Sequence, residues 1–177
     1  MTRTGLLVLV LSVAVAGGVA PTASAKETGD AGAEAASGAQ AFIRQAAMGG
    51  LAEVALGKLA QEKASDPAVK TFGGRMVTDH GKANQELEAL AKKENVTLPT
   101  QLDARHEALR DRLAKLSGDA FDEAYMSEMV EDHEKDVAEF RAAATASTDA
   151  DVKAFAAKTL PVLEGHLKMA KDVRQSL

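Results

Sequence analysis

The sequence predicts an all-α protein, a four-helix bundle with a short extra helix in the crossover between its second and third long helices. Hydrophobic residues make up 46% of the chain but aromatic residues only 3%, so the core must be built mainly from Ala, Leu, Val and Met. Alanine favours helices because it loses no side-chain entropy there. Apolar residues also recur at helical spacings of three and four in four long segments.

The N-terminus has the features of a secretion signal. Arg3 precedes an uncharged apolar stretch at 5–16, and small residues at 23–25 (ASA) occupy the positions that a signal peptidase recognises. We therefore expect cleavage after Ala25 and export to the periplasm, the cell wall or the medium. An uncleaved anchor is the alternative, but the apolar stretch is short for a span of ~20 residues.

Composition narrows the function classes. The chain has no cysteine, which excludes a lipid-modified cysteine, disulfide bonds and thiolate metal ligands. Its net charge is −5, and no basic stripe appears. An acidic chain of this kind is a poor ligand for nucleic acid, and no segment after the signal predicts stable membrane insertion. Protein partners are not indicated.

The segment 26–38 is small, polar and glycine-rich, so we expect a disordered spacer before a domain at 39–177. The first long helix is predicted at about 39–64. Its inward stripe contains small residues and one carboxylate, Glu53, which is unusual on an apolar face. The second helix is predicted to begin with Asp66 as N-cap and Pro67 in the first turn. His80 lies on its apolar stripe.

The remaining helices follow the same logic. A short amphipathic helix is expected at 102–116, with His106 facing solvent. A third long helix at 119–146 carries His133 on its inward stripe, and a fourth opens at Asp149 and carries His166. Pro161 lies inside this last pattern and should kink the helix.

The lengths of the connections predict the topology. The first and third turns are short, whereas about 24 residues separate the second long helix from the third. A connection of that length returns the chain along the bundle. We therefore predict the ferritin-like arrangement, with the second and third long helices as parallel neighbours.

Several motifs at once resemble one known family. They are 47–54 (AMGGLAEV), 56–57 (LG), 76–80 (MVTDH), 121–126 (FDEAYM), 129–133 (MVEDH), 159–161 (TLP) and 166–167 (HL). Over about 40–173 the chain is similar to a widespread family of exported bacterial proteins with a ferritin-like fold. That family is classed as a domain of unknown function and often labelled an outer-membrane protein. The resemblance implies the fold and export but attaches no reaction.

Each long helix places one metal-ligating residue type on its inward stripe: Glu53, His80, His133 and His166. His80 and His133 each come 14 residues after the start of their helix, about 21 Å along the axis. Facing helices of a bundle often build metal sites at mid-length. The sequence therefore predicts a candidate metal site in the bundle interior.

The identity of the metal stays open between copper, zinc and iron. A di-iron site needs Glu-x-x-His on two helices, but Val77 and Val130 occupy the Glu positions. Met76 and Met129 each lie one turn from a histidine, and imidazole with thioether suits copper. Three histidines with Glu53 equally suit zinc or iron.

Two other interpretations remain at this stage. The histidines and methionines are also compatible with a structural or stress-related envelope protein whose polar core residues only specify packing. A small metallo-oxidase is the third interpretation. No nucleophile elbow, phosphate-binding loop, dinucleotide fingerprint or zinc-protease motif is found, so the sequence favours a non-enzymatic protein. Asp79 and Asp132 point about 100° away from their histidine neighbours, which predicts surface or supporting roles.

Overall fold

The computed structural model describes the backbone of residues 27–177 and the side chains from residue 38 onward. This part of the chain is entirely helical between its turns, which confirms the predicted fold class. The expected signal peptide at 1–25 lies outside the described residues. The helices are α1 (Glu27–Lys63), α2 (Pro67–Lys93), α3 (Ala104–Ala114), α4 (Gly118–Ala146) and α5 (Ala150–Ser176).

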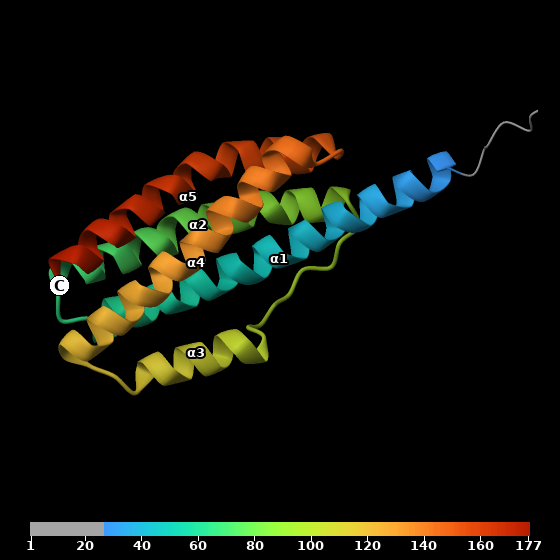
Figure 1. Cartoon of the computed structure of the whole chain (residues 1–177). Helices are drawn as coiled ribbons and strands as arrows, with labels where there is room; N and C mark the ends of the chain where they lie inside the picture. The colour runs from blue at the N-terminus through green and yellow to red at the C-terminus, as the bar shows by residue number, and fades with distance from the viewer. Residues whose placement is uncertain (1–26) are drawn as a thin grey trace, which may run out of the picture.

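The four long helices form two antiparallel hairpins, α1 with α2 and α4 with α5 (Figure 1). The crossover that contains α3 returns the chain along the bundle, so α2 and α4 run in the same direction, as predicted. They are not neighbours, however, and that part of the prediction is wrong. Because α3 packs against α1 and α4, the crossover delivers α4 beside α1, and α5 then packs against α2.

The predicted helix starts are correct at two positions. The Asp66 side chain accepts a hydrogen bond from the backbone of Ala68, next to Pro67 in the first turn of α2. The Asp149 carboxylate caps α5 in the same way. Helix α5 continues without a break through Pro161, which lies on its exposed side.

The structure differs from the sequence-based expectation in two segments. Helix α1 begins at Glu27, so 27–38 is helical where a disordered spacer was expected. Four alanines lie at 31–36, and the helix propensity of alanine requires no apolar stripe. His106 was expected to face solvent, but only 12% of its side chain is exposed, because its ring turns back to Asp103 at the start of α3.

The core has two halves with the histidines between them. At one end, Phe42 packs edge-on against Phe140, with ring centroids 5.0 Å apart. At the other end, Phe72 packs against Tyr125 at 6.2 Å. Small residues allow α1 and α2 to approach closely near this second cluster. A Cβ atom on Gly57 would lie 2.6 Å from the carbonyl oxygen of Gly73.

One buried carboxylate connects the two hairpins. Asp122 on α4 is only 1% exposed, and it accepts hydrogen bonds from the turn between α1 and α2. Its donors are the backbone N–H and hydroxyl of Ser65 and the backbone N–H of Asp66, at 2.5 to 3.2 Å. Sequence spacing does not reveal this role of Asp122, because its partners lie more than fifty positions away.

We expect Asp122→Ala to lower the free energy of unfolding by about 2–3 kcal/mol, because it leaves several turn donors without an acceptor. Asp119→Ala is the matched control, since Asp119 is exposed and makes one hydrogen bond, of 3.3 Å, to the Ser65 hydroxyl. That control should change stability by less than about 0.5 kcal/mol. Urea denaturation measures both, and equal effects would show that Asp122 does not hold the turn.

Candidate metal centre

Three imidazole rings from three helices meet at the middle of the bundle. They belong to His80 of α2, His133 of α4 and His166 of α5, all buried. The ring centroids are 5.8 Å apart for His80 and His133, and 5.4 Å for each of the other two pairs. One nitrogen from each ring lies within 4.8 Å of those from the other two. His166 therefore lies at the same level of the bundle as the other two histidines.

The ring of His133 is oriented by its own helix. Its Nδ1 lies 2.8 Å from the carbonyl oxygen of Met129, one turn earlier. A carbonyl oxygen only accepts hydrogen bonds, so Nδ1 carries the hydrogen of the neutral ring and Nε2 holds the lone pair.

The ring of His166 is oriented from a neighbouring helix. Its Nε2 lies 2.9 Å from Oδ2 of Asp79 on α2, and Arg75 donates to the same oxygen at 3.1 Å. Burial raises the pKa of Asp79, but the hydrogen bonds from His166 and Arg75 outweigh this and lower it overall. The ionised Asp79 accepts the hydrogen from Nε2, which leaves the lone pair on Nδ1. The supporting role expected for Asp79 agrees with this geometry.

The opposite nitrogens have no such partner. Among the side chains of residues 38–177, His80 Nε2, His133 Nε2 and His166 Nδ1 are buried and form no hydrogen bond. A buried polar atom without a partner is unfavourable and is rare in native proteins. Each of the three histidine rings contains one such nitrogen atom.

Burial keeps the three rings neutral. It lowers the pKa of His80 to about 3, with smaller contributions from His133 and His166. It likewise lowers the pKa of His133 to about 4, and that of His166 despite the opposing effect of Asp79. Neutral imidazole is the form that binds metal ions, so these rings need not lose a proton first at neutral pH.

Glu53 lies beside the group and outside it. Its Oε1 is 3.7 Å from Nδ1 of His133, the nitrogen that already faces the Met129 carbonyl. Both carboxyl oxygens are fully buried and have no hydrogen-bond partner in the described part of the chain. Burial raises the pKa of Glu53 well above its ordinary value, and the neighbouring Asp132 and Asp136 raise it further.

Met76 and Met129 are fully buried in the core cluster that also contains Phe72 and Tyr125. The backbone carbonyl of Met129 has a defined role, because it orients His133. The Tyr125 hydroxyl is another buried polar group without a hydrogen bond among the described side chains. Burial first, and then the charge of Glu53, raises its pKa well above the usual value.

Acidic side chains on one face of α4 also belong to the surroundings of the site. Asp132, Asp136 and Glu139 are half-buried at a spacing of four and three residues. Burial, and then the charges of Asp132 and Glu139, raises the pKa of Asp136 to about 7. Of these three residues only Asp132 was identified from the sequence, although their helical spacing places all three on one face.

The fold and the histidine group define the class of protein, a helical bundle with a candidate metal centre in its core. The chain belongs to the family described as domain of unknown function DUF4142, whose model matches residues 24–173. No curated protein sequence matches the chain. Among the described residues, no helix is both long and apolar enough to cross a membrane.

Two solved structures share the fold. One is a fragment of a DUF305 protein from Deinococcus radiodurans, with a TM-score of 0.69 and 14% identity, over 78% of this chain and 96% of that one. The other is a candidate secreted DUF305 protein from Streptomyces coelicolor, with a TM-score of 0.65 and 14% identity, over 76% and 89% of the two chains. At this identity the likeness shows the fold alone.

His80→Leu should make the metal-free protein less sensitive to acid. The folded state takes up a proton at His80 only near pH 3, whereas the unfolded chain does so near pH 6.5. Between these values the unfolded state binds more protons, so the His80 contribution to stability falls as pH falls. When the pH is lowered from 7 to 4.5, the unfolding free energy of the variant should therefore rise by about 2–3 kcal/mol relative to that of wild type. Urea denaturation with a chelator measures this, and a constant difference would contradict it.

For Asp136→Asn, the dependence of stability on pH relative to wild type should have the opposite sign to that of His80→Leu. The pKa of Asp136 rises from 3.8 in the unfolded chain to about 7 in the folded protein, so wild type loses stability as pH rises through this range. Asparagine does not ionise. The variant should therefore gain stability relative to wild type between pH 5 and pH 8, measured in the same denaturation series. A gain that is equal at both pH values would show that Asp136 ionises normally.

Proposed function

We propose that this protein is an exported, non-enzymatic metal-binding bundle that holds one transition-metal ion between His80, His133 and His166. One observation carries the proposal. Three buried imidazoles meet with one nitrogen from each within 4.8 Å, and each ring has a buried nitrogen with no partner among the described side chains. Packing alone offers no reason to gather three such atoms in an apolar core, because each is unfavourable there.

The surrounding contacts resemble those that support metal-bound histidines elsewhere. A ligating histidine almost always gives its other N–H to a carbonyl or a carboxylate, which sets the tautomer and the orientation of the ring. His133 does so to the Met129 carbonyl, and His166 does so to Asp79. In both rings the lone pair is then on the nitrogen that lacks a partner.

The donor set selects the class of metal. Three neutral imidazoles without a thiolate suit late first-row ions, and the affinity of nitrogen sites rises from manganese through iron to copper, with zinc below copper. A metal–nitrogen bond of about 2.0–2.1 Å in tetrahedral geometry needs nitrogens about 3.4 Å apart. One nitrogen from each ring lies within 4.8 Å of the other two, so the rings would turn inward on binding.

Charge also favours a cation at this position. Asp79 already places a negative charge against His166, and Glu53 is a fully buried acid beside His133. A divalent ion nearby lowers the pKa of Glu53, so the acid loses its proton and balances the charge. Metal binding at neutral pH should then release a proton even though the histidines are already neutral.

Export supports this function, because an exported protein is in contact with the metal ions outside the cytoplasm. The signal-like segment and the likeness to a candidate secreted bundle point to that location. A structural envelope protein is the alternative in which the histidines only specify packing. A small metallo-oxidase is the other alternative, and oxygen or peroxide turnover by the metal-loaded protein would identify it.

The test is thermal unfolding of the tag-free exported protein with copper, zinc, iron and manganese ions in turn. An ion at 100 times its dissociation constant should stabilise the fold by ~2.7 kcal/mol. Copper should bind most tightly and manganese least. The double variant His80→Ala, His133→Ala should lose the effect, and His106→Ala should keep it because His106 lies outside the group.

Two results would overturn the proposal. No stabilisation by any of the four ions would leave the histidines as core architecture. Stabilisation that persists in the double variant would place the metal outside the histidine group. Nitrogen hyperfine coupling from imidazole in the spectrum of the copper form supplies a readout that does not depend on stability.

A further inference from the structure

Two cavities lie one behind the other at the aromatic end of the bundle. The outer one is an open groove of about 650 Å³ between the start of the described part of α1 and the end of α4. The inner one is a cavity of about 30 Å³ that reaches His80. Gln45 and Glu139 line both cavities. They therefore stand between the surface groove and the histidine group.

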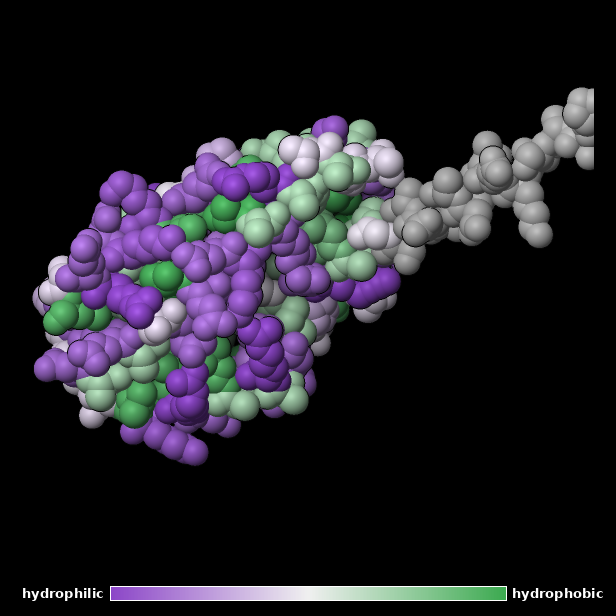
Figure 2. Space-filling model, viewed as in Figure 1, coloured by the Kyte–Doolittle hydropathy of each residue, from purple (hydrophilic) through white to green (hydrophobic). Residues whose placement is uncertain are grey.

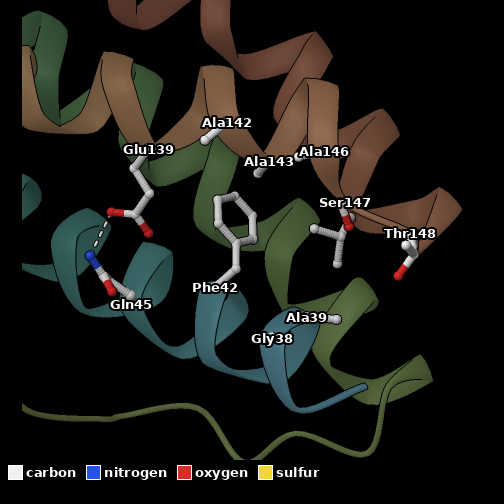
Figure 3. A pocket seen from close by; sticks show the side chains of 11 residues that line it. Gly38, Ala39, Phe42, Gln45, Glu139, Ala142, Ala143, Ala146, Ser147 and Thr148 are labelled. Carbon is white, nitrogen blue, oxygen red and sulfur yellow. Dashed lines mark hydrogen bonds between the residues drawn. The ribbon is translucent and has the colours of Figure 1, made fainter. Parts of the chain in front are cut away.

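Gln45 and Glu139 join α1 to α4 at this position. The Gln45 side-chain N–H donates to Glu139 Oε2 at 2.5 Å (Figure 3). Helices α1 and α4 belong to different hairpins, so this pair lies on a seam between hairpins. Gln45 is exposed and Glu139 is half-buried, and the contact between them is a single hydrogen bond between side chains.

The bundle axis beside this pair is filled. Phe42, Phe140 and Phe155 pack together with ring centroids 5.0 to 6.5 Å apart. In Figure 3 the ring of Phe42 points from α1 toward α4 next to the Gln45–Glu139 pair. Figure 2 shows weakly hydrophobic side chains around the end where α4 joins α5. A cation crosses such apolar packing poorly, whereas the polar pair offers it oxygen atoms.

The inner cavity is polar where it meets the site. Asp136 lines it from α4, Asn84 from α2, and His80 forms part of its wall. A Cβ atom on Gly50 would lie 2.0 Å from the Asn84 side-chain oxygen, so glycine at this position makes room for the amide. A cavity of about 30 Å³ holds one or two molecules the size of water, which also fits an ion that has lost most of its hydration shell.

We propose that Gln45 and Glu139 form the entrance through which a metal cation reaches the three histidines, with Asp136 as the next contact on the way. This inference rests on the proposed function. The Glu139 carboxylate attracts the hydrated cation in the groove and replaces part of its water. The Gln45 amide turns aside, and the cation passes to Asp136 and then to His80. Each carboxylate lowers the barrier to entry because it offsets the loss of hydration.

Stopped-flow loading of the full exported protein with Co²⁺, followed by the visible absorption of the bound ion, tests the route. Glu139→Gln should slow loading at least about tenfold, a barrier increase of about 1.4 kcal/mol. Release into excess chelator should slow by a similar factor, because entrance and exit use the same path. The equilibrium dissociation constant should then change less than about threefold. Glu131→Gln is the matched control, since it removes the same charge from an exposed position of α4 and should load like wild type.

A second variant blocks the route without changing charge. Gly49 lines the inner cavity, and a Cβ atom there meets no atom within 4 Å, so the backbone accommodates the first carbon of a Gly49→Leu side chain. It should slow loading and release together while circular dichroism shows the helical content unchanged. Faster loading in either variant would also contradict the route.

The outcomes separate the two proposals. If wild type binds no Co²⁺, copper or zinc, the proposed function fails and the entrance fails with it. If wild type binds the ion but Glu139→Gln and Gly49→Leu load at the wild-type rate, only the entrance is overturned. If Glu139→Gln weakens equilibrium binding without slowing loading, Glu139 acts on the bound ion and is not part of an entrance.

Discussion

The burial of three imidazoles in an apolar helical core is the constraint on which the rest of this structure depends. A charged ring would be strongly unfavourable there, and burial accordingly lowers the pKa values of all three rings. A neutral ring still needs a partner for its N–H. The Met129 carbonyl supplies one for His133, and Asp79 supplies one for His166. These two contacts decide which nitrogen of each of these two rings keeps its lone pair.

The burial of the three imidazoles together also requires one particular arrangement of the two hairpins. His80 comes from the first hairpin, and His133 and His166 come from the second, so the group forms only when the hairpins are correctly placed against each other. Asp122 contributes to that placement, because it binds the turn of one hairpin from a helix of the other. The carboxyl groups of Asp136 and Glu139 line a cavity at the seam between α1 and α4, which belong to different hairpins. The proposed metal site in the core and the proposed acidic path along the seam therefore depend on the same placement of the two hairpins.

Much of the fold was predictable from particular residues. Asp66 with Pro67, and Asp149, mark helix starts through local hydrogen bonds that the neighbouring sequence specifies. The inward position of the histidines followed from helical spacing, and the structure buries all three. The neighbours of each helix were less predictable. A long crossover fixes the direction of α4 but not the side on which it returns, and here α3 carries it to α1.

The partners of the residues that support the candidate site could not be predicted from the sequence. Glu53 shares the inward stripe, but the structure places it beside the hydrogen-bonded nitrogen of His133 and outside the group of three histidines. The link from Asp79 to His166 spans 87 positions, and that from Asp122 to the first turn spans more than fifty. The sequence by itself determined the helices, their caps and their buried faces, because these depend on interactions within a few turns. Only the tertiary structure decided which buried polar atoms meet and which stay without partners, because the positions of side chains on different helices depend on how the whole bundle packs.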